Sequence, residues 1–135
     1  MNKFRELCQQ LEDKIKKSYE QGVTLEDAEK LAGEFLYAQL QVSQQLKTAS
    51  LDARMRKSGV KAIRAAIYLN IVQNQDGKRP TEANIAAMID SDKLSNEEQL
   101  AYDTAEVSSQ ELERFYNIFS NAHIFYRGIS KGKFE

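Results

Sequence analysis

Apolar side chains at helical spacing run through residues 25–67 almost without a break. The spacing alternates three and four residues for about six heptads, which is typical of a helix that packs against other helices. Two polar residues, Gln39 and Arg56, occupy positions of this apolar seam. The seam comprises Leu25, Ala28, Ala32, Phe35, Val42, Leu46, Ala49, Ala53, Val60, Ile63 and Ile67.

The seam predicts one long helix over residues 24–73, opened by Thr24 as its cap. An unbroken helix of this extent would be about 70 Å long, which a chain of this size cannot cover alone. We therefore expect a bundle helix that also packs against other copies. Gly59, preceded by Ser58, is the position where the sequence most favours a kink or break.

Two further regions also have helical patterns. Residues 1–22 predict an amphipathic helix that stops before Gly22. Residues 80–135 predict a short helix begun by Pro80 or Thr81, then a long C-terminal helix that starts at the capping box formed by Ser95 and Glu98. From Leu112 onward this last helix is apolar on two stripes, which suggests that a neighbouring subunit covers one of them.

No strand-like alternation of any length occurs. The predicted fold is all-α: long helices with a heptad seam, forming a single helical domain over residues 1–135 that assembles as a bundle into a homo-oligomer.

The sequence offers little for catalysis. The lone cysteine, Cys8, excludes an intramolecular disulfide, and we expect it to be a packed residue; the lone histidine, His123, falls among aromatic residues, where packing is again expected. No phosphate-binding glycine loop, dinucleotide fingerprint or metalloprotease motif is present. The acidic residues of the second half lack a supporting lysine or histidine constellation. We therefore predict no enzyme activity, no cofactor and no metal site.

Charge is strongly segregated along the chain. Residues 47–79 carry a net charge of +6 and residues 80–113 carry −8. Part of the basic segment forms a track on one helical face beside the seam, which predicts contact with a polyanion through its phosphates. The predicted nucleic-acid-binding residues are Lys47, Arg54, Arg56, Lys57, Lys61, Arg64, Lys78 and Arg79.

Three points about this basic segment remain open. The +6 and −8 segments can instead face each other within or between subunits. Tyr68, one turn beyond Arg64, is either a base-stacking surface or a packed residue. Arg56 lies in the seam, where burial without a partner is costly, so either the bundle opens there or an acidic group or phosphate meets it.

The run Leu51–Met55, LDARM, resembles the LKARL element of the UvsY-type recombination mediators of tailed phages. KRPTEANIAAMIDSD, residues 78–92, is similar to segments of small phage proteins of this kind, and the likeness covers roughly residues 45–135. In the family's element a lysine and an arginine contact DNA. Only Arg54 carries over, because Asp52 stands where the lysine would be.

The resemblance implies an all-helical, ring-like homo-oligomer that binds single-stranded DNA without sequence preference. It also implies a non-enzymatic role in recombination: loading a RecA-like recombinase onto strands covered by single-strand-binding protein. With neither a signal-peptide pattern nor a membrane-spanning stretch, the expected location is the cytoplasm, that of the host if the protein is phage-encoded.

Two alternatives belong to other functional classes. One is a protein-only helical adaptor or phage assembly factor, in which the +6 and −8 segments dock subunits together. The other is a small metal-dependent enzyme that uses the acidic residues.

Overall fold

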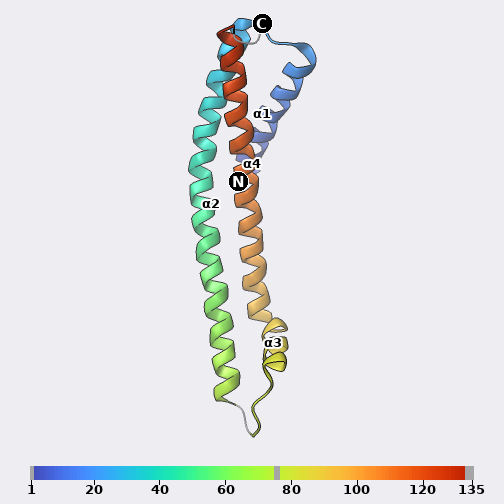
Figure 1. The fold of residues 1–135 in the computed structure, drawn as a ribbon, viewed down its shortest axis with the longest axis vertical. Coiled ribbons are helices and arrows are strands. Elements are labelled where there is room, and N and C mark those ends of the chain that lie inside the picture. Colours follow the sequence, from blue (N-terminus) through green and yellow to red (C-terminus); the bar gives the residue numbers. More distant parts are fainter. Residues whose placement is uncertain (1, 75–76, 133–135) are drawn as a thin grey trace. The chain divides into compact units, whose positions relative to one another are not determined.

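The computed structural model describes residues 2–74 and 77–132 of the 135-residue chain. Nearly all of these residues belong to four helices: α1 (Asn2–Gln21), α2 (Leu25–Gln73), α3 (Glu82–Asp90) and α4 (Lys93–Ser130) (Figure 1). No strand occurs among the described residues, and the prediction of an all-α fold is confirmed.

Polar and glycine residues end and begin these helices. Gly22 follows α1 with φ at 77°, a left-handed conformation that glycine adopts without steric cost. Thr24 Oγ1 accepts a hydrogen bond from the backbone N–H of Asp27 at 3.1 Å, as expected of the cap of α2. Thr81 caps α3 in the same way, through the N–H of Asn84 at 3.2 Å.

The start of α4 differs from the prediction. The helix begins at Lys93, and the carboxylate of Asp92 accepts a hydrogen bond from the N–H of Ser95 at 2.9 Å. Ser95 therefore lies inside the first turn, where it is buried. The predicted start at Ser95 was wrong because Asp92, an equally good capping residue, lies three positions earlier.

The long helix α2 continues through both Gly33 and Gly59. Neither glycine has a positive φ, so neither interrupts the helical backbone. The seam is buried most completely at Ala28, Ala32, Phe35 and Val42. Beyond Val42, Val60 is the only seam residue that is fully buried, so the seam is less covered in its C-terminal half.

The chain, expected to form one helical domain, divides into two compact units. The first unit comprises residues 1–46 and 110–135, and the second comprises residues 47–109. Both α2 and α4 contribute residues to each unit.

An aromatic core holds the first unit together. The ring of Phe35 on α2 lies 5.6 Å from Phe119 and 5.6 Å from Tyr126, both on α4, and Phe115 lies 5.8 Å from Phe119. Such offset or tilted ring pairs add to the free energy gained by burying the rings. This unit therefore has a core that it forms without a partner chain.

Helix α1 completes the first unit. Arg5 pairs with Glu111 at 2.8 Å, Glu12 pairs with Arg114 at 3.3 Å, and the hydroxyls of Ser18 and Tyr126 are hydrogen-bonded. A surface hollow beside these contacts is lined from both α1 and α4, by Ile15, Tyr19, Ile118, Asn121, Ala122, Phe125 and Tyr126. The second apolar stripe of the C-terminal helix, Ile118, Phe125 and Ile129, thus lines surface hollows shared with α1 of the same chain, and Phe125 is still 43% exposed there.

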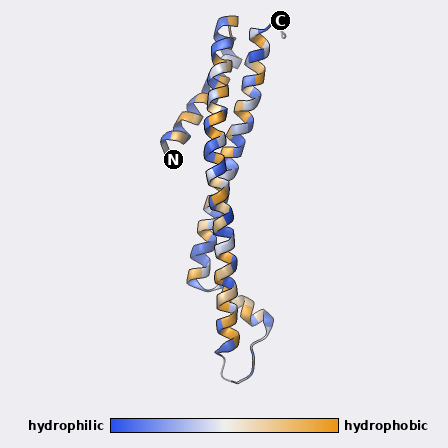
Figure 2. Cartoon of the chain, turned by 90° about the vertical axis from the view of Figure 1, so that its left-hand side faces the viewer, coloured by the Kyte–Doolittle hydropathy of each residue, from blue (hydrophilic) through white to orange (hydrophobic). Residues whose placement is uncertain are grey.

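The second unit has a much smaller core. Its fully buried hydrophobic residues are Val60, Ile85 and Ile89, together with the polar Ser95. Between α2 and α4 of this unit, the hydroxyls of Ser50 and Ser109 are 3.1 Å apart. Seen from the side of α2, hydrophobic residues recur along the outer surface of the helix near its C-terminal end (Figure 2).

Within the described residues, no helix is long and apolar enough to cross a membrane.

Candidate nucleic-acid interface

All eight cations predicted to bind nucleic acid belong to the second unit. Six lie on α2 and two, Lys78 and Arg79, follow it in the connection to α3. Helical periodicity places Lys47, Arg54 and Lys61 in one row at seven-residue intervals, and Lys57 and Arg64 in a second row nearer the seam. The predicted basic track is thus two adjacent rows on one side of α2.

Five of the eight cations are exposed and have no ion-pair partner among residues 2–74 and 77–132: Lys47, Arg54, Lys57, Lys61 and Lys78. Four of them lie on α2 within four helical turns. We call these four, Lys47, Arg54, Lys57 and Lys61, the open track. Unpaired exposed cations are available to phosphate groups without first losing a protein partner.

Arg64 is occupied within the protein. One of its Nη atoms lies 2.8 Å from Asp90 Oδ1 at the end of α3, and the other lies 3.5 Å from the hydroxyl of the buried Ser95. The guanidinium therefore joins α2 to the corner between α3 and α4. Its fork of donors suits this role, since one side chain can contact two partners.

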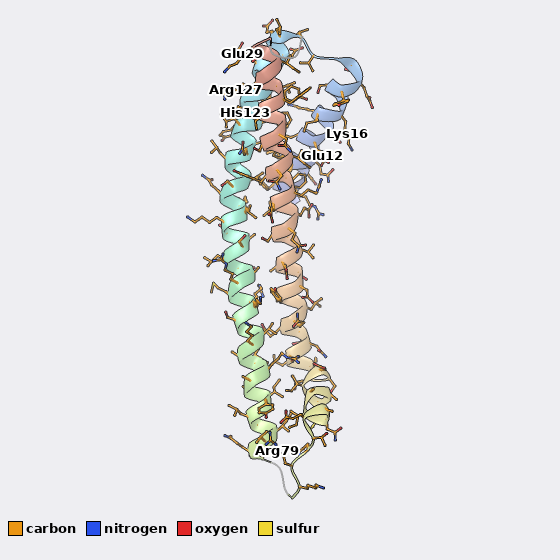
Figure 3. The ribbon with its side chains drawn as sticks, in the orientation of Figure 1. Glu12, Lys16, Glu29, Arg79, His123 and Arg127 are labelled. Carbon is orange, nitrogen blue, oxygen red and sulfur yellow. The ribbon has the colours of Figure 1, made fainter. Side chains whose placement is uncertain are left out.

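Arg79 is occupied as well (Figure 3). Its guanidinium donates to Glu82 Oε1 at 2.8 Å and to the hydroxyl of Tyr68 at 2.8 Å. The Tyr68 hydroxyl donates to the same Glu82 oxygen at 3.2 Å. This three-residue network ties the start of α3 to α2, and it favours the packing interpretation of Tyr68 over base stacking.

Arg56 meets both conditions named for it. Its side chain is 43% exposed despite its seam position, and it pairs with Asp52 one turn earlier on α2 at 3.2 Å. The expectation that the bundle opens at Arg56 or that an acidic group meets it is therefore confirmed. The carboxylate that meets Arg56 comes from the same helix.

The basic and acidic segments of the second unit therefore meet in only two described ion pairs, Arg64–Asp90 and Arg79–Glu82. Glu97 and Asp103 on α4 are exposed, and Glu98 and Glu106 are partly exposed. A hydrogen bond to Glu106 is the largest of several effects that raise the pKa of Tyr102 in this region. Among the residues described, no three histidine, cysteine or acidic side chains are grouped so as to hold a metal ion.

Cys8 and His123 lie in the first unit, apart from the open track. Cys8 is buried, and burial, with a smaller contribution from the charge of Glu111, raises the pKa of its thiol to about 11. A thiol with so high a pKa is a poor nucleophile at neutral pH. The Nδ1 atom of His123 lies 2.9 Å from the carbonyl oxygen of Ala32, a packing contact between α4 and α2.

Sequence reasoning missed a second feature of α2. Leu51, Met55 and Leu69 are exposed on the side of the helix roughly opposite the seam. These residues have helical spacing in the sequence, but their apolar pattern is weaker than that of the seam on the other face. The row formed by Lys47, Arg54 and Lys61 borders this outer stripe.

In comparisons with protein families, curated proteins and solved structures, nothing matched this chain.

Proposed function

We propose that the protein is a non-enzymatic, single-stranded-DNA-binding accessory protein that works as a homo-oligomer. The observation that carries this proposal is the open track: four exposed cations without described ion-pair partners on one side of α2. From Lys47 to Lys61 this track spans about 21 Å of helix. It offers phosphates four positive charges in two adjacent rows on one side of the helix.

The chemistry of the track fits nonspecific binding to a flexible strand. Lysine and arginine neutralise phosphates and release condensed counterions, whatever the base sequence. Four such contacts on a single strand correspond to a slope of roughly −3 in a plot of log affinity against log salt concentration. No element that would read base edges in a groove stands out, so we expect little base preference.

A role in recombination is the finer part of the proposal. It rests on the resemblance of Leu51–Met55 and residues 78–92 to UvsY-type mediators. Arg54, the arginine that matches the family's DNA-contacting residue, is exposed on α2 and belongs to the open track. We therefore propose that the oligomer helps to load a RecA-like recombinase onto strands covered by single-strand-binding protein.

Titration of a labelled oligo(dT) with the full-length protein over a range of salt concentrations tests the proposal. Fluorescence anisotropy should show saturable binding that weakens steeply with salt and is tighter than binding to a duplex of matched length. Equal affinity for single strand and duplex would indicate generic polyanion attraction. Absence of binding at low salt would refute the proposed function.

The exposed outer stripe of α2 favours a second candidate, a protein-only helical adaptor. Leu51, Met55 and Leu69 present apolar surface that a nucleic acid backbone does not need. An adaptor would keep its assembly state and bind no oligonucleotide. Parallel measurements of assembly and of oligo(dT) binding separate the two candidates.

A further inference from the structure

The outer stripe of α2 in the second unit is largely apolar and is interrupted by the exposed Ser58. The exposed fractions of Leu51 and Met55 are 58% and 66%, and that of Leu69 is 53%. Ala62 and Ala66, also exposed, fill the positions between them at helical spacing. The small alanines allow a second helix to approach closely. We define the outer stripe as Leu51, Met55, Ala62, Ala66 and Leu69.

One edge of the outer stripe is basic. Lys47, Arg54 and Lys61 follow it at seven-residue intervals, exposed and without described ion-pair partners. A surface that combines apolar residues with one row of positive charge fits a partner with the opposite arrangement, apolar residues beside carboxylates.

The second unit carries such an arrangement on α4. Leu100 and Val107 are 67% and 61% exposed and are seven residues apart, so they share one face of the helix. Asp103 lies between them along this face, and Glu97 lies one turn before Leu100; both carboxylates are exposed. Their described contacts are also on the surface of α4, where Asp103 accepts a hydrogen bond from Gln99 at 3.0 Å and Glu97 lies 4.0 Å from Lys93. We call Glu97, Leu100, Asp103 and Val107 the acidic face of α4.

We infer that the outer stripe of α2 in one chain docks on the acidic face of α4 in a second copy of the chain. Leu100 and Val107 would pack on Leu51 and Met55, while Asp103 and Glu97 would meet the row that contains Arg54. This inference specifies the surfaces behind the homo-oligomer of the proposed function. It does not depend on DNA binding.

The charges on the two surfaces favour this contact over a symmetric contact between two outer stripes. A twofold contact between two outer stripes would bring two rows of lysine and arginine together, and like charges in an interface are costly. The contact between α2 and α4 instead pairs opposite charges. It joins different surfaces of the two chains, so repetition produces a closed ring or a filament.

Charge exchange in the full-length chain tests the contact. Arg54→Glu and Asp103→Arg, each alone, should weaken self-association by about tenfold or more in sedimentation velocity without DNA, because each brings like charges together. The double variant should recover association, because every interface then pairs opposite charges again. Circular dichroism serves as the check that each variant is folded.

Cross-linking gives a second, independent measurement. An oxidised mixture of Met55→Cys and Leu100→Cys chains should form a disulfide-linked heterodimer, while the parent chain, whose only cysteine is buried, serves as the control. Cross-linked Met55→Cys homodimers without the heterodimer would overturn the inference in favour of a symmetric contact.

The inference also fails if the parent chain stays monomeric at high concentration, or if the double charge variant associates as weakly as the single ones. Failure of the proposed function looks different, because assembly would be intact while oligo(dT) is not bound. Lys57 lies in the row away from the outer stripe, so Lys57→Ala tests DNA binding without altering the proposed contact.

Discussion

In the unit formed by residues 1–46 and 110–135, α2 packs on α4 through Phe35, Phe115, Phe119 and Tyr126, and α1 adds ion pairs along the side. In the unit formed by residues 47–109, the same two helices are joined by a hydrogen bond between Ser50 and Ser109, and few residues are fully buried. Burial therefore differs along the same two helices. The first unit holds the larger buried core, and the second carries the exposed open track and outer stripe.

The largest expected effect comes from the aromatic core. Phe119→Ala removes a fully buried ring that packs on both Phe35 and Phe115, and it should lower the free energy of unfolding by about 3–5 kcal/mol. Met55→Ala, in the exposed outer stripe, should change it by less than about 0.5 kcal/mol. Urea denaturation followed by circular dichroism measures both. Equal losses would remove the contrast between the two units.

The free energy of unfolding at alkaline pH tests whether Cys8 is buried in the core of the first unit. The raised pKa means that the folded state keeps the thiol neutral up to about pH 11, while the unfolded chain ionises it near pH 9. The contribution of the neutral Cys8 thiol to the free energy of unfolding is therefore complete below pH 9. It is lost as pH rises toward 11, and the loss is at most about 2–3 kcal/mol.

Cys8→Ala should accordingly show a shallower fall in unfolding free energy between pH 8 and 10.5 than the parent chain. Tyrosine and lysine titrations are common to both chains and cancel in the difference. If the unfolding free energy falls equally with pH in the two chains, the Cys8 thiol is not buried in the way that the structure shows.

The next effect lies in the open track. Lys57→Ala/Lys61→Ala should weaken oligo(dT) binding by about tenfold and make the salt slope less steep by roughly 1.4. Lys16→Ala/Lys17→Ala on α1 removes the same charge from the first unit and should change binding far less. The binding affinities are compared only for variants that sediment like the parent chain, so that a change in assembly does not alter the result. Similar losses in both double variants would show that only net charge matters.

The smallest expected effect concerns Arg64. Asp90→Asn releases this arginine from its ion pair and should strengthen oligo(dT) binding by about two- to threefold, as one more cation becomes available. The pair is largely exposed, so stability should change by less than about 1 kcal/mol. Glu113→Gln, which removes an exposed carboxylate of α4 that forms no ion pair among the described residues, is the matched control. An equal gain in the control would assign the effect to general electrostatics.

Periodicity and capping chemistry were sufficient to predict much of the fold. The seam predicted α2, and Thr24 was identified as its cap because an N-cap depends only on neighbouring residues. The start of the short helix was left between Pro80 and Thr81, and the structure has Thr81 as the cap. Ser95 misled the prediction because two capping candidates lie three residues apart, and local chemistry alone does not rank them. Gly59 did not break α2, because the cost of one glycine is small in a long packed helix.

The candidate site was only partly readable from the sequence. Spacing placed the cations on one side of α2, but it could not show that Asp90 and Glu82 engage Arg64 and Arg79, because these contacts depend on where α3 folds back. The seam left open whether Arg56 is exposed or meets an acidic group, because the heptad pattern carries no information on how many helices cover each seam position. The DNA-binding role itself remains a prediction.

Hydrogen–deuterium exchange with and without saturating oligo(dT) tests most directly whether the first unit holds the stable core and the second unit binds DNA. Without DNA, the amides of residues 110–130 should exchange more slowly than those of residues 47–73, because the first unit holds the larger core. With DNA, we predict added protection in peptides that cover residues 47–64 and little change in the first unit. Protection concentrated in α1, or in the first-unit part of α4, would contradict the assignment of binding to the open track.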